Sequence, residues 1–149
     1  MAASARDVPG AAGDPAGGGG LLLELEFAAG SLYLLRQAVA THAAAAGLGE
    51  ARVRDVGLAV NELASNAVRH GAGRGRLRMW GQDGAVCCQV QDAGREPRGG
   101  WAGERGQAGA VGWPYARGHG LWLVRLLADQ MSATSGPGGT CVTVWFARR

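Results

Sequence analysis

The chain has 149 residues, enough for one domain with a single hydrophobic core, and 15 basic residues against 12 acidic ones give a formal net charge of +3. Every basic residue is Arg, and the absence of Lys excludes a Gly-Lys-Ser/Thr phosphate loop, the ion-paired Lys of eukaryotic-type kinases and Schiff-base chemistry. The arginines are scattered among acids and form no basic stripe, so direct binding to nucleic acid is not expected.

The pattern of apolar residues and cysteines bears on the compartment. No run of about 18 apolar residues occurs, and two Glu interrupt the apolar stretch that begins at Leu21, so no membrane span or signal peptide is expected. Cys87 and Cys88 would face opposite sides of one strand, and Cys141 lies in another predicted strand. We therefore expect buried, reduced thiols, no metal site or disulfide framework, and a cytoplasmic protein.

The first predicted element is a strand that follows a glycine-rich tail. Residues 1–20 contain almost nothing to bury and are predicted to be disordered, which leaves residues 21–149 as the folded domain. From Leu21 to Phe27, apolar residues alternate with Glu. This alternation is typical of a half-buried strand.

Two helices are predicted next. Ser31 is placed to cap a helix over residues 32–46, which a glycine ends. In the second, from Val53 to Gly71, most apolar residues share one arc at about 100° per residue, and Glu62 and Asn66 fall opposite them. Glu62 and Asn66 are four apart, so their Cβ atoms are expected about 5–6 Å from each other. A carboxylate beside an amide favours chemistry on this face, and a solvated face is the alternative.

The middle of the chain predicts a β-hairpin that ends in an acid. Strands over Leu77–Trp80 and Ala85–Asp92 are joined by a turn containing Asp-Gly. Counting by twos, Asp92 ends a row of core side chains, so its carboxylate needs a partner to be buried there. A simple turn cap is the alternative for Asp92. Gly94 lets a backbone or a flat ligand come close.

Residues 95–117 show no periodicity and are rich in Gly, with Pro and Trp, so we expect either a functional lid or disorder. Gly118 and Gly120 then open a helix over Leu121–Met131. Glycines at a helix N-terminus leave backbone amides free to meet phosphate oxygens, although an ordinary glycine entry to a helix is the alternative.

Two final strands complete the predicted fold. Ser132–Ser135 is a short strand, and Thr140–Ala147 is the last one, with the Thr140 hydroxyl on its buried side. The order of elements predicts an α/β two-layer sandwich, with a mainly antiparallel sheet and three helices on one face. A ligand could lie between the helices and the sheet, where the polar residues gather.

Four motifs together resemble the ATP-binding domains of the GHKL superfamily, which includes gyrase, heat-shock chaperones, mismatch-repair proteins and histidine kinases. The runs NELASNAVRHG, DAG, GHGLWLV and the GT before the last strand resemble its N, G1, G2 and G3 boxes. Within the superfamily, NELxxNAxxHG and GxGLWLVxxLAD resemble the bacterial anti-sigma regulatory factor branch, whose members are serine protein kinases. The resemblance covers about residues 21–146.

The resemblance implies a Mg-ATP site between helices and sheet. It makes Asn66 the Mg²⁺ ligand and Glu62 the general base that removes a proton from a serine hydroxyl or water in line with the γ-phosphate. It makes Asp92 the acceptor for the adenine amino group, with Thr140 supporting that contact and Gly94 allowing close approach of the base. The cofactor-binding residues implied are Asn66, Asp92, Gly94, Gly118, Gly120 and Thr140.

Contacts of the flexible ATP lid, about residues 95–117, do not transfer, because this segment is longer and richer in Gly and Arg than a tight lid. One of four arginines there could reach the γ-phosphate. The resemblance leaves a phosphate-side role or a packing role for His70, and His119 receives no role. The lid arginines are Arg95, Arg98, Arg105 and Arg117.

Two functional hypotheses follow from the resemblance. In the first, the protein is a serine/threonine kinase that uses Mg-ATP to phosphorylate a small anti-anti-sigma (antagonist) partner. In the second, it is a nucleotide-switched module that sequesters a sigma factor with little or no phosphoryl transfer. Glu62 favours the kinase, because a nucleotide sensor needs Asn66 and Asp92 but no base. The resemblance also allows a homodimer.

Overall fold

The computed structural model describes residues 20–92, 121–136 and 139–148. Gly94, Gly118, Gly120, the proposed lid and most of the N-terminal tail lie outside these residues. The elements are β1 (Leu21–Ala28), η2 (Ala29–Ser31), α2 (Leu32–Ala45), α3 (Glu50–His70), β2 (Arg74–Gln82), β3 (Ala85–Asp92), α5 (Leu121–Leu127), β4 (Gln130–Gly136) and β5 (Gly139–Ala147).

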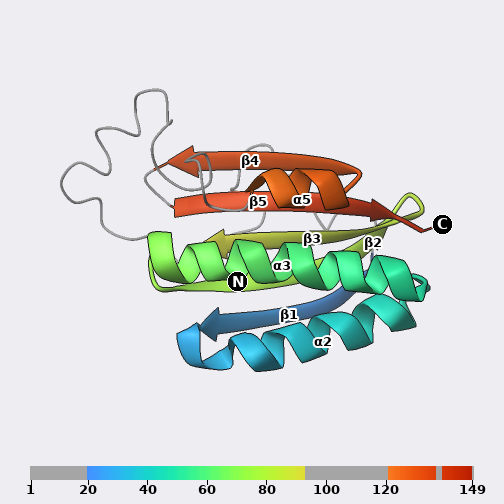
Figure 1. Cartoon of the computed structure of the whole chain (residues 1–149), viewed down its shortest axis with the longest axis horizontal. Coiled ribbons are helices and arrows are strands. Elements are labelled where there is room, and N and C mark those ends of the chain that lie inside the picture. Colours follow the sequence, from blue (N-terminus) through green and yellow to red (C-terminus); the bar gives the residue numbers. More distant parts are fainter. Residues whose placement is uncertain (1–19, 93–120, 137–138, 149) are drawn as a thin grey trace.

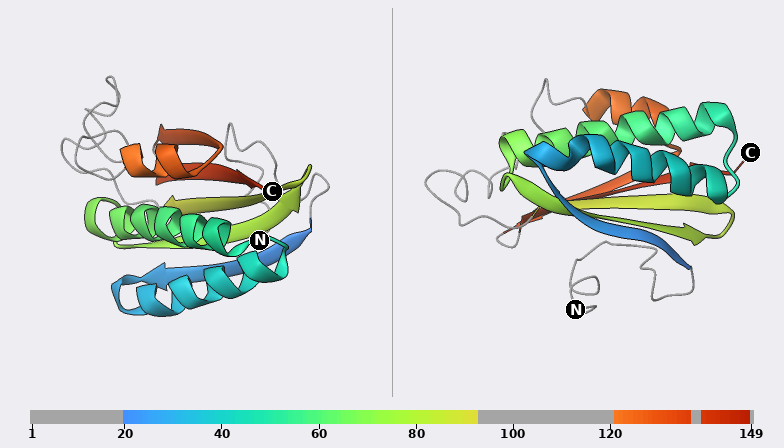
Figure 2. Two further views of the ribbon diagram at one scale, coloured as in Figure 1. Left: turned by 45° about the vertical axis from the view of Figure 1, so that its right-hand side comes forward. Right: turned by 90° about the horizontal axis from the view of Figure 1, so that it is seen from below.

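The described residues form two layers, a five-stranded sheet and a layer of three α-helices on one of its faces (Figures 1 and 2). The strand order is β1-β2-β3-β5-β4, and every pair of neighbours is antiparallel. The predicted α/β sandwich with three helices on one face is confirmed. No helix in the described parts of the chain is both long enough and apolar enough to cross a membrane.

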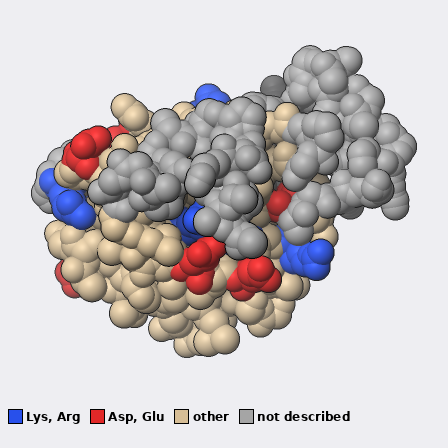
Figure 3. Space-filling model, turned by 180° about the vertical axis from the view of Figure 1, so that it is seen from behind, with Lys and Arg blue, Asp and Glu red and all other residues tan. Residues whose placement is uncertain are grey.

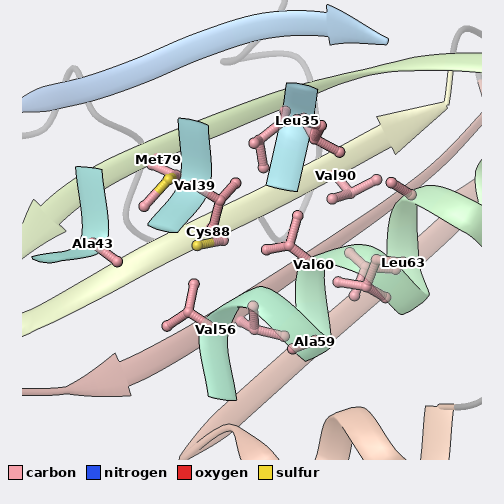
Figure 4. Packing of buried hydrophobic residues seen from close by; sticks show 14 of the residues in the cluster. Leu35, Val39, Ala43, Val56, Ala59, Val60, Leu63, Met79, Cys88 and Val90 are labelled. Atoms are coloured by element: carbon pink, nitrogen blue, oxygen red, sulfur yellow. The ribbon is translucent and has the colours of Figure 1, made fainter. Parts of the chain in front are cut away.

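The core lies between the helices and the sheet, and it contains the apolar residues that the sequence periodicity selects. Val90 of β3 lies between Leu35 of α2 and the side chains of Val60 and Leu63 of α3 (Figure 4). All four are at most 1% exposed. Burial of this apolar arc is the main force that holds α3 on the sheet, because apolar area removed from water stabilises at about 25 cal/mol per Å².

The turn between β2 and β3 forms as the Asp-Gly pair predicts. Asp83 and Gly84 have φ angles of 48° and 76°, so both central residues are left-handed. A two-residue turn of this hand matches the twist of the two strands. It fixes the register in which Trp80 pairs with Cys87 and Leu77 with Val90.

Several predicted boundaries and one cap differ from the structure. The second helix begins at Glu50 instead of Val53, and α5 ends at Leu127 instead of Met131, because Gln130 already pairs with Trp145 in the sheet. Ser31 does not cap α2. Its hydroxyl instead accepts from the Ala28 amide at 3.0 Å and donates to the Ala28 carbonyl oxygen, which stabilises the short 3-10 turn before the helix.

The sheet face without helices is also buried at its centre. Trp80 and Cys87 are 0% exposed, and on the same face the Gln89 side-chain amide donates to the Thr143 hydroxyl at 3.2 Å. Toward β1, arginines of β2 lie beside Glu24 and Glu26, with N–O distances of 3.7–3.8 Å. Figure 3 views this side, where basic and acidic side chains adjoin. Because the N–O distances are long and the two carboxylates are exposed, each pair contributes little stability.

The three cysteines are free and buried, as predicted. Cys88 belongs to the core beneath the helices, and its neighbour Cys87 faces the opposite side of the sheet. Burial raises the pKa of the thiols of Cys87 and Cys141 to about 12. At neutral pH the thiols are therefore protonated and weakly nucleophilic.

Candidate functional site

One end of the sheet carries a row of five residues, one from each strand, on the face beneath the helices. Phe27 pairs with Gly75, and Gly75 with Asp92. On the other side Thr140 pairs with Ser135. The last pair between β3 and β5 is Gln91 with Cys141, so the register sets Thr140 beside Asp92. The row therefore brings together two predicted site residues from separate parts of the chain.

Asp92 and Thr140 are buried polar residues in this row, with exposed fractions of 3% and 0%. Both strands alternate, so these side chains share the face of Val90 and Val142 and end the core at this edge. A buried carboxylate accepts hydrogen bonds, whereas a buried hydroxyl can donate one and accept others. Such a pair suits a planar ligand that carries a donor beside an acceptor.

Gly75 belongs to the row that forms the candidate site, and the sequence analysis missed it. A Cβ at this position would lie 2.6 Å from the backbone oxygen of Gln91, 2.7 Å from Cζ of Phe27 and 3.3 Å from Cα of Asp92. Glycine therefore lets the Phe27 ring and β3 approach at the residue where Asp92 is held. The signal was present, but the predicted strand began at Leu77 and left this glycine outside it.

Ser135 makes a contact to the site that the sequence did not indicate. Its hydroxyl oxygen lies 3.2 Å from the hydroxyl oxygen of Thr140, across the β4–β5 pair. Thr140 is completely buried, whereas Ser135 is exposed. The contact extends the candidate site to β4, a strand that contains none of the site residues expected from the sequence.

Above this end of the sheet, α3 supplies Glu62 and Asn66. The helix and β3 run in the same direction, so their C-terminal ends lie at the same end of the molecule (Figure 1). Asn66 follows the core residue Leu63 toward this end of the helix, and Asp92 follows the core residue Val90 toward this end of the strand. Glu62 is partly exposed, as expected for a side chain opposite the core arc. The carboxylate and the amide are four residues apart on one continuous helix, as predicted.

Asn66 corrects one expectation, because it is 0% exposed although it was placed on the face away from the core. At about 100° per residue, Asn66 points within about 40° of the direction of Arg52. Arg52 donates to the Leu127 carbonyl oxygen at 3.1 Å, so α3 faces α5 at the level of Arg52, about 21 Å along the helix from Asn66. The burial of Asn66 comes from parts of the chain outside α3, which a helical wheel of α3 alone cannot show.

Arg52 fastens α5 and the turn after it to α3. Besides the Leu127 oxygen, it binds the carboxylates of Asp55 and Asp129, and its guanidinium lies 5.1 Å from the centre of the Phe146 ring. Asp129 in turn accepts from the Ala147 amide at 2.7 Å. This network holds the end of α5, whose beginning follows the predicted phosphate-binding glycines.

The predicted site residues thus fall into two groups. Glu62 and Asn66 lie on α3, and Asp92 and Thr140 lie at the end of the sheet beneath the helix layer. Gly94, Gly118 and Gly120 are outside the described residues, as are His119 and the lid arginines; His70 is the exposed last residue of α3. Within the described parts, no cluster of three or more His, Cys, Asp or Glu could hold a metal by itself.

Comparison with known proteins gives one family and one fold. The family described as histidine kinase-like ATPase domain matches residues 25–146. No curated protein gives a significant match. A crystal structure of the RsbU and RsbW domains of Rv1364c from Mycobacterium tuberculosis is similar in fold, with a TM-score of 0.60 and 20% identity. The match covers 84% of this chain, which spans only 32% of that one.

Proposed function

Because this chain belongs to the family of histidine kinase-like ATPase domains, we propose that it is an ATP-binding regulatory protein, an anti-sigma factor that phosphorylates serine or threonine in an anti-anti-sigma partner. The four sequence motifs support this branch of the family. The similar fold of a protein with an RsbW domain agrees with it. The sequestration of a sigma factor would be the regulatory output.

The base-binding end of the proposed site rests on Asp92. Its buried carboxylate can accept hydrogen bonds, and the 6-amino group of adenine is a donor of the matching kind. Thr140 lies beside it and supports this contact through its hydroxyl. The carboxylate favours adenine over hypoxanthine at position 6, because it accepts from an amino group but repels a carbonyl oxygen.

The phosphate end of the proposed site rests on Asn66 and Glu62. The amide oxygen of Asn66 fits Mg²⁺, which takes few protein ligands and leaves its other positions to phosphate oxygens and water. When bound, Mg²⁺ neutralises charge on the phosphates. Glu62 takes up the proton of the attacking serine hydroxyl, and its partial exposure leaves it accessible to a second protein.

One observation carries the proposal: a buried amide and a partly exposed carboxylate stand on α3 above a buried carboxylate at the end of the sheet. The test begins with calorimetric titration of Mg-ATP into the wild type, Asp92→Ala and Asn66→Ala. We expect Asp92→Ala to abolish binding and Asn66→Ala to remove its Mg²⁺ dependence. Asn61→Ala is the matched control, because Asn61 lies on the same helix but binds Arg36.

The kinase step is tested by incubating the protein with radiolabelled ATP and each anti-anti-sigma protein of the source organism. We expect phosphoserine or phosphothreonine on one of them, lost in Glu62→Gln and kept in Glu50→Gln, which alters an exposed acid at the start of α3. Nucleotide binding with complex formation but without transfer would contradict the kinase and leave a nucleotide-switched module. Absence of Mg-ATP binding by the wild type would refute both.

A further inference from the structure

We infer that Ser135 is a positioning residue for recognition of the nucleotide base and acts through Thr140. The inference rests on the proposed adenine site and extends it to β4. Its basis is the hydroxyl pair that joins β4 to β5 at the edge of that site.

The strand pairing determines which way Ser135 points. Met131 and Ala133 precede it at intervals of two, and both pack against the core beneath the helices. Ser135 therefore shares their face, which is also the face of Thr140, its pairing partner. The 3.2 Å separation of the two hydroxyl oxygens follows from this register.

The position of Thr140 connects the pair to Asp92. Thr140 has no exposed surface, and the register of β3 with β5 sets it beside Asp92. Ser135, Thr140 and Asp92 therefore occupy neighbouring strands in one row. Ser135 lies at the end of the row, two strands from Asp92 and separated from it by Thr140.

A hydroxyl has one proton, so its hydrogen bonds to different partners are coupled. Either hydroxyl of the pair can be the donor, and in the arrangement that we infer Ser135 donates to Thr140. The Thr140 proton is then available to the side of the site where Asp92 lies. Without Ser135, the hydroxyl of Thr140 loses this constraint, and its support of the contact between Asp92 and the base becomes weaker. Ordering of one neutral hydrogen bond corresponds to about a threefold to tenfold change in affinity.

The experiment compares ATP with ITP, whose base carries a 6-oxo group in place of the amino group that Asp92 would bind. Calorimetry with both nucleotides is done on the wild type, Ser135→Ala and Ser135→Thr. Ser135→Ala should weaken ATP binding about threefold to tenfold and ITP binding much less, so that the preference for ATP falls. Ser135→Thr keeps a hydroxyl and should restore the preference. Mg²⁺ dependence should not change.

Two controls separate positioning from a structural role. Ser132→Ala changes a serine of the same strand on the opposite face and should leave both affinities unaltered. In a Thr140→Val background, Ser135→Ala should cause no further loss, because its effect passes through the missing hydroxyl. The melting temperature of Ser135→Ala should stay close to that of the wild type, since water can replace a partner at this exposed position.

Two results would overturn the inference while leaving the nucleotide site intact. One is an equal loss of ATP and ITP affinity accompanied by a lower melting temperature, which would make the hydroxyl pair a structural cross-strand contact. The other is an undiminished effect of Ser135→Ala in the Thr140→Val background. A wild type that binds neither nucleotide would instead refute the adenine site, and the positioning role with it.

Discussion

Replacement of Gly75 by alanine tests how the end of the sheet is packed. The added Cβ would lie 2.6 Å from the Gln91 carbonyl oxygen, about 0.8 Å short of ordinary contact at 3.4 Å, and 2.7 Å from Cζ of Phe27. Neither neighbour moves easily, because the oxygen belongs to β3 and the Phe27 ring is only 4% exposed.

The loss in the free energy of unfolding caused by Gly75→Ala follows from these contacts. Overpacking of a well-packed site costs about 1–3 kcal/mol, and two rigid neighbours favour the upper end. Alanine recovers about 0.5–1 kcal/mol of backbone entropy relative to glycine in a strand. We therefore expect a net loss of about 2 kcal/mol, which lowers the melting temperature of a domain of this size by roughly 6 °C.

Gly57→Ala is the matched control, because a Cβ at this position on α3 has no atom within 4 Å other than those of its chain neighbours and its own helix backbone. Alanine in a helix interior should raise stability by about 1 kcal/mol. Calorimetric melting and urea unfolding of both variants give the comparison. Gly75→Ala should also weaken Mg-ATP binding about tenfold, because displacement of Gln91 moves Asp92. A Gly75→Ala protein as stable as the wild type would refute the close packing inferred for this edge.

Two further predictions concern stability. Arg52→Ala should lower the free energy of unfolding by about 1–3 kcal/mol in urea titrations, because Asp129 and the Leu127 oxygen lose the hydrogen bonds that Arg52 donates. The control, exposed Arg54→Ala, should change it by at most about 0.5 kcal/mol, and equal effects of the two substitutions would contradict the network. Burial raises the pKa of Cys87 and Cys141 from 9.0 to about 12, so the folded state keeps protons that the unfolded state loses, and stability should fall as pH rises from 9 toward 12. In urea unfolding at pH 8 and 10.5, Cys87→Ala/Cys141→Ala should lose less stability than the wild type; an equal loss would show that other groups cause the decline.

Local patterns in the sequence were sufficient for the elements and for the fold class. Alternation in Leu21–Phe27 and Ala85–Asp92 predicted strands because side chains of a strand point to opposite faces. The helical arc in Val53–Gly71 predicted α3, and the Asp-Gly pair predicted the β-hairpin. The motifs that contain Glu62 and Asp92 then led to the family.

Contacts between distant elements were decided only by the tertiary structure. Asn66 is buried although it lies opposite the apolar arc of α3, and Gly75 is needed because Phe27 and Gln91 converge on it from two other strands. Ser135 meets Thr140 only through the register of β4 with β5. Periodicity shows which side of one helix or strand is apolar. Each of these contacts instead depends on which other element packs there. A pattern within a single segment contains no information about that neighbour.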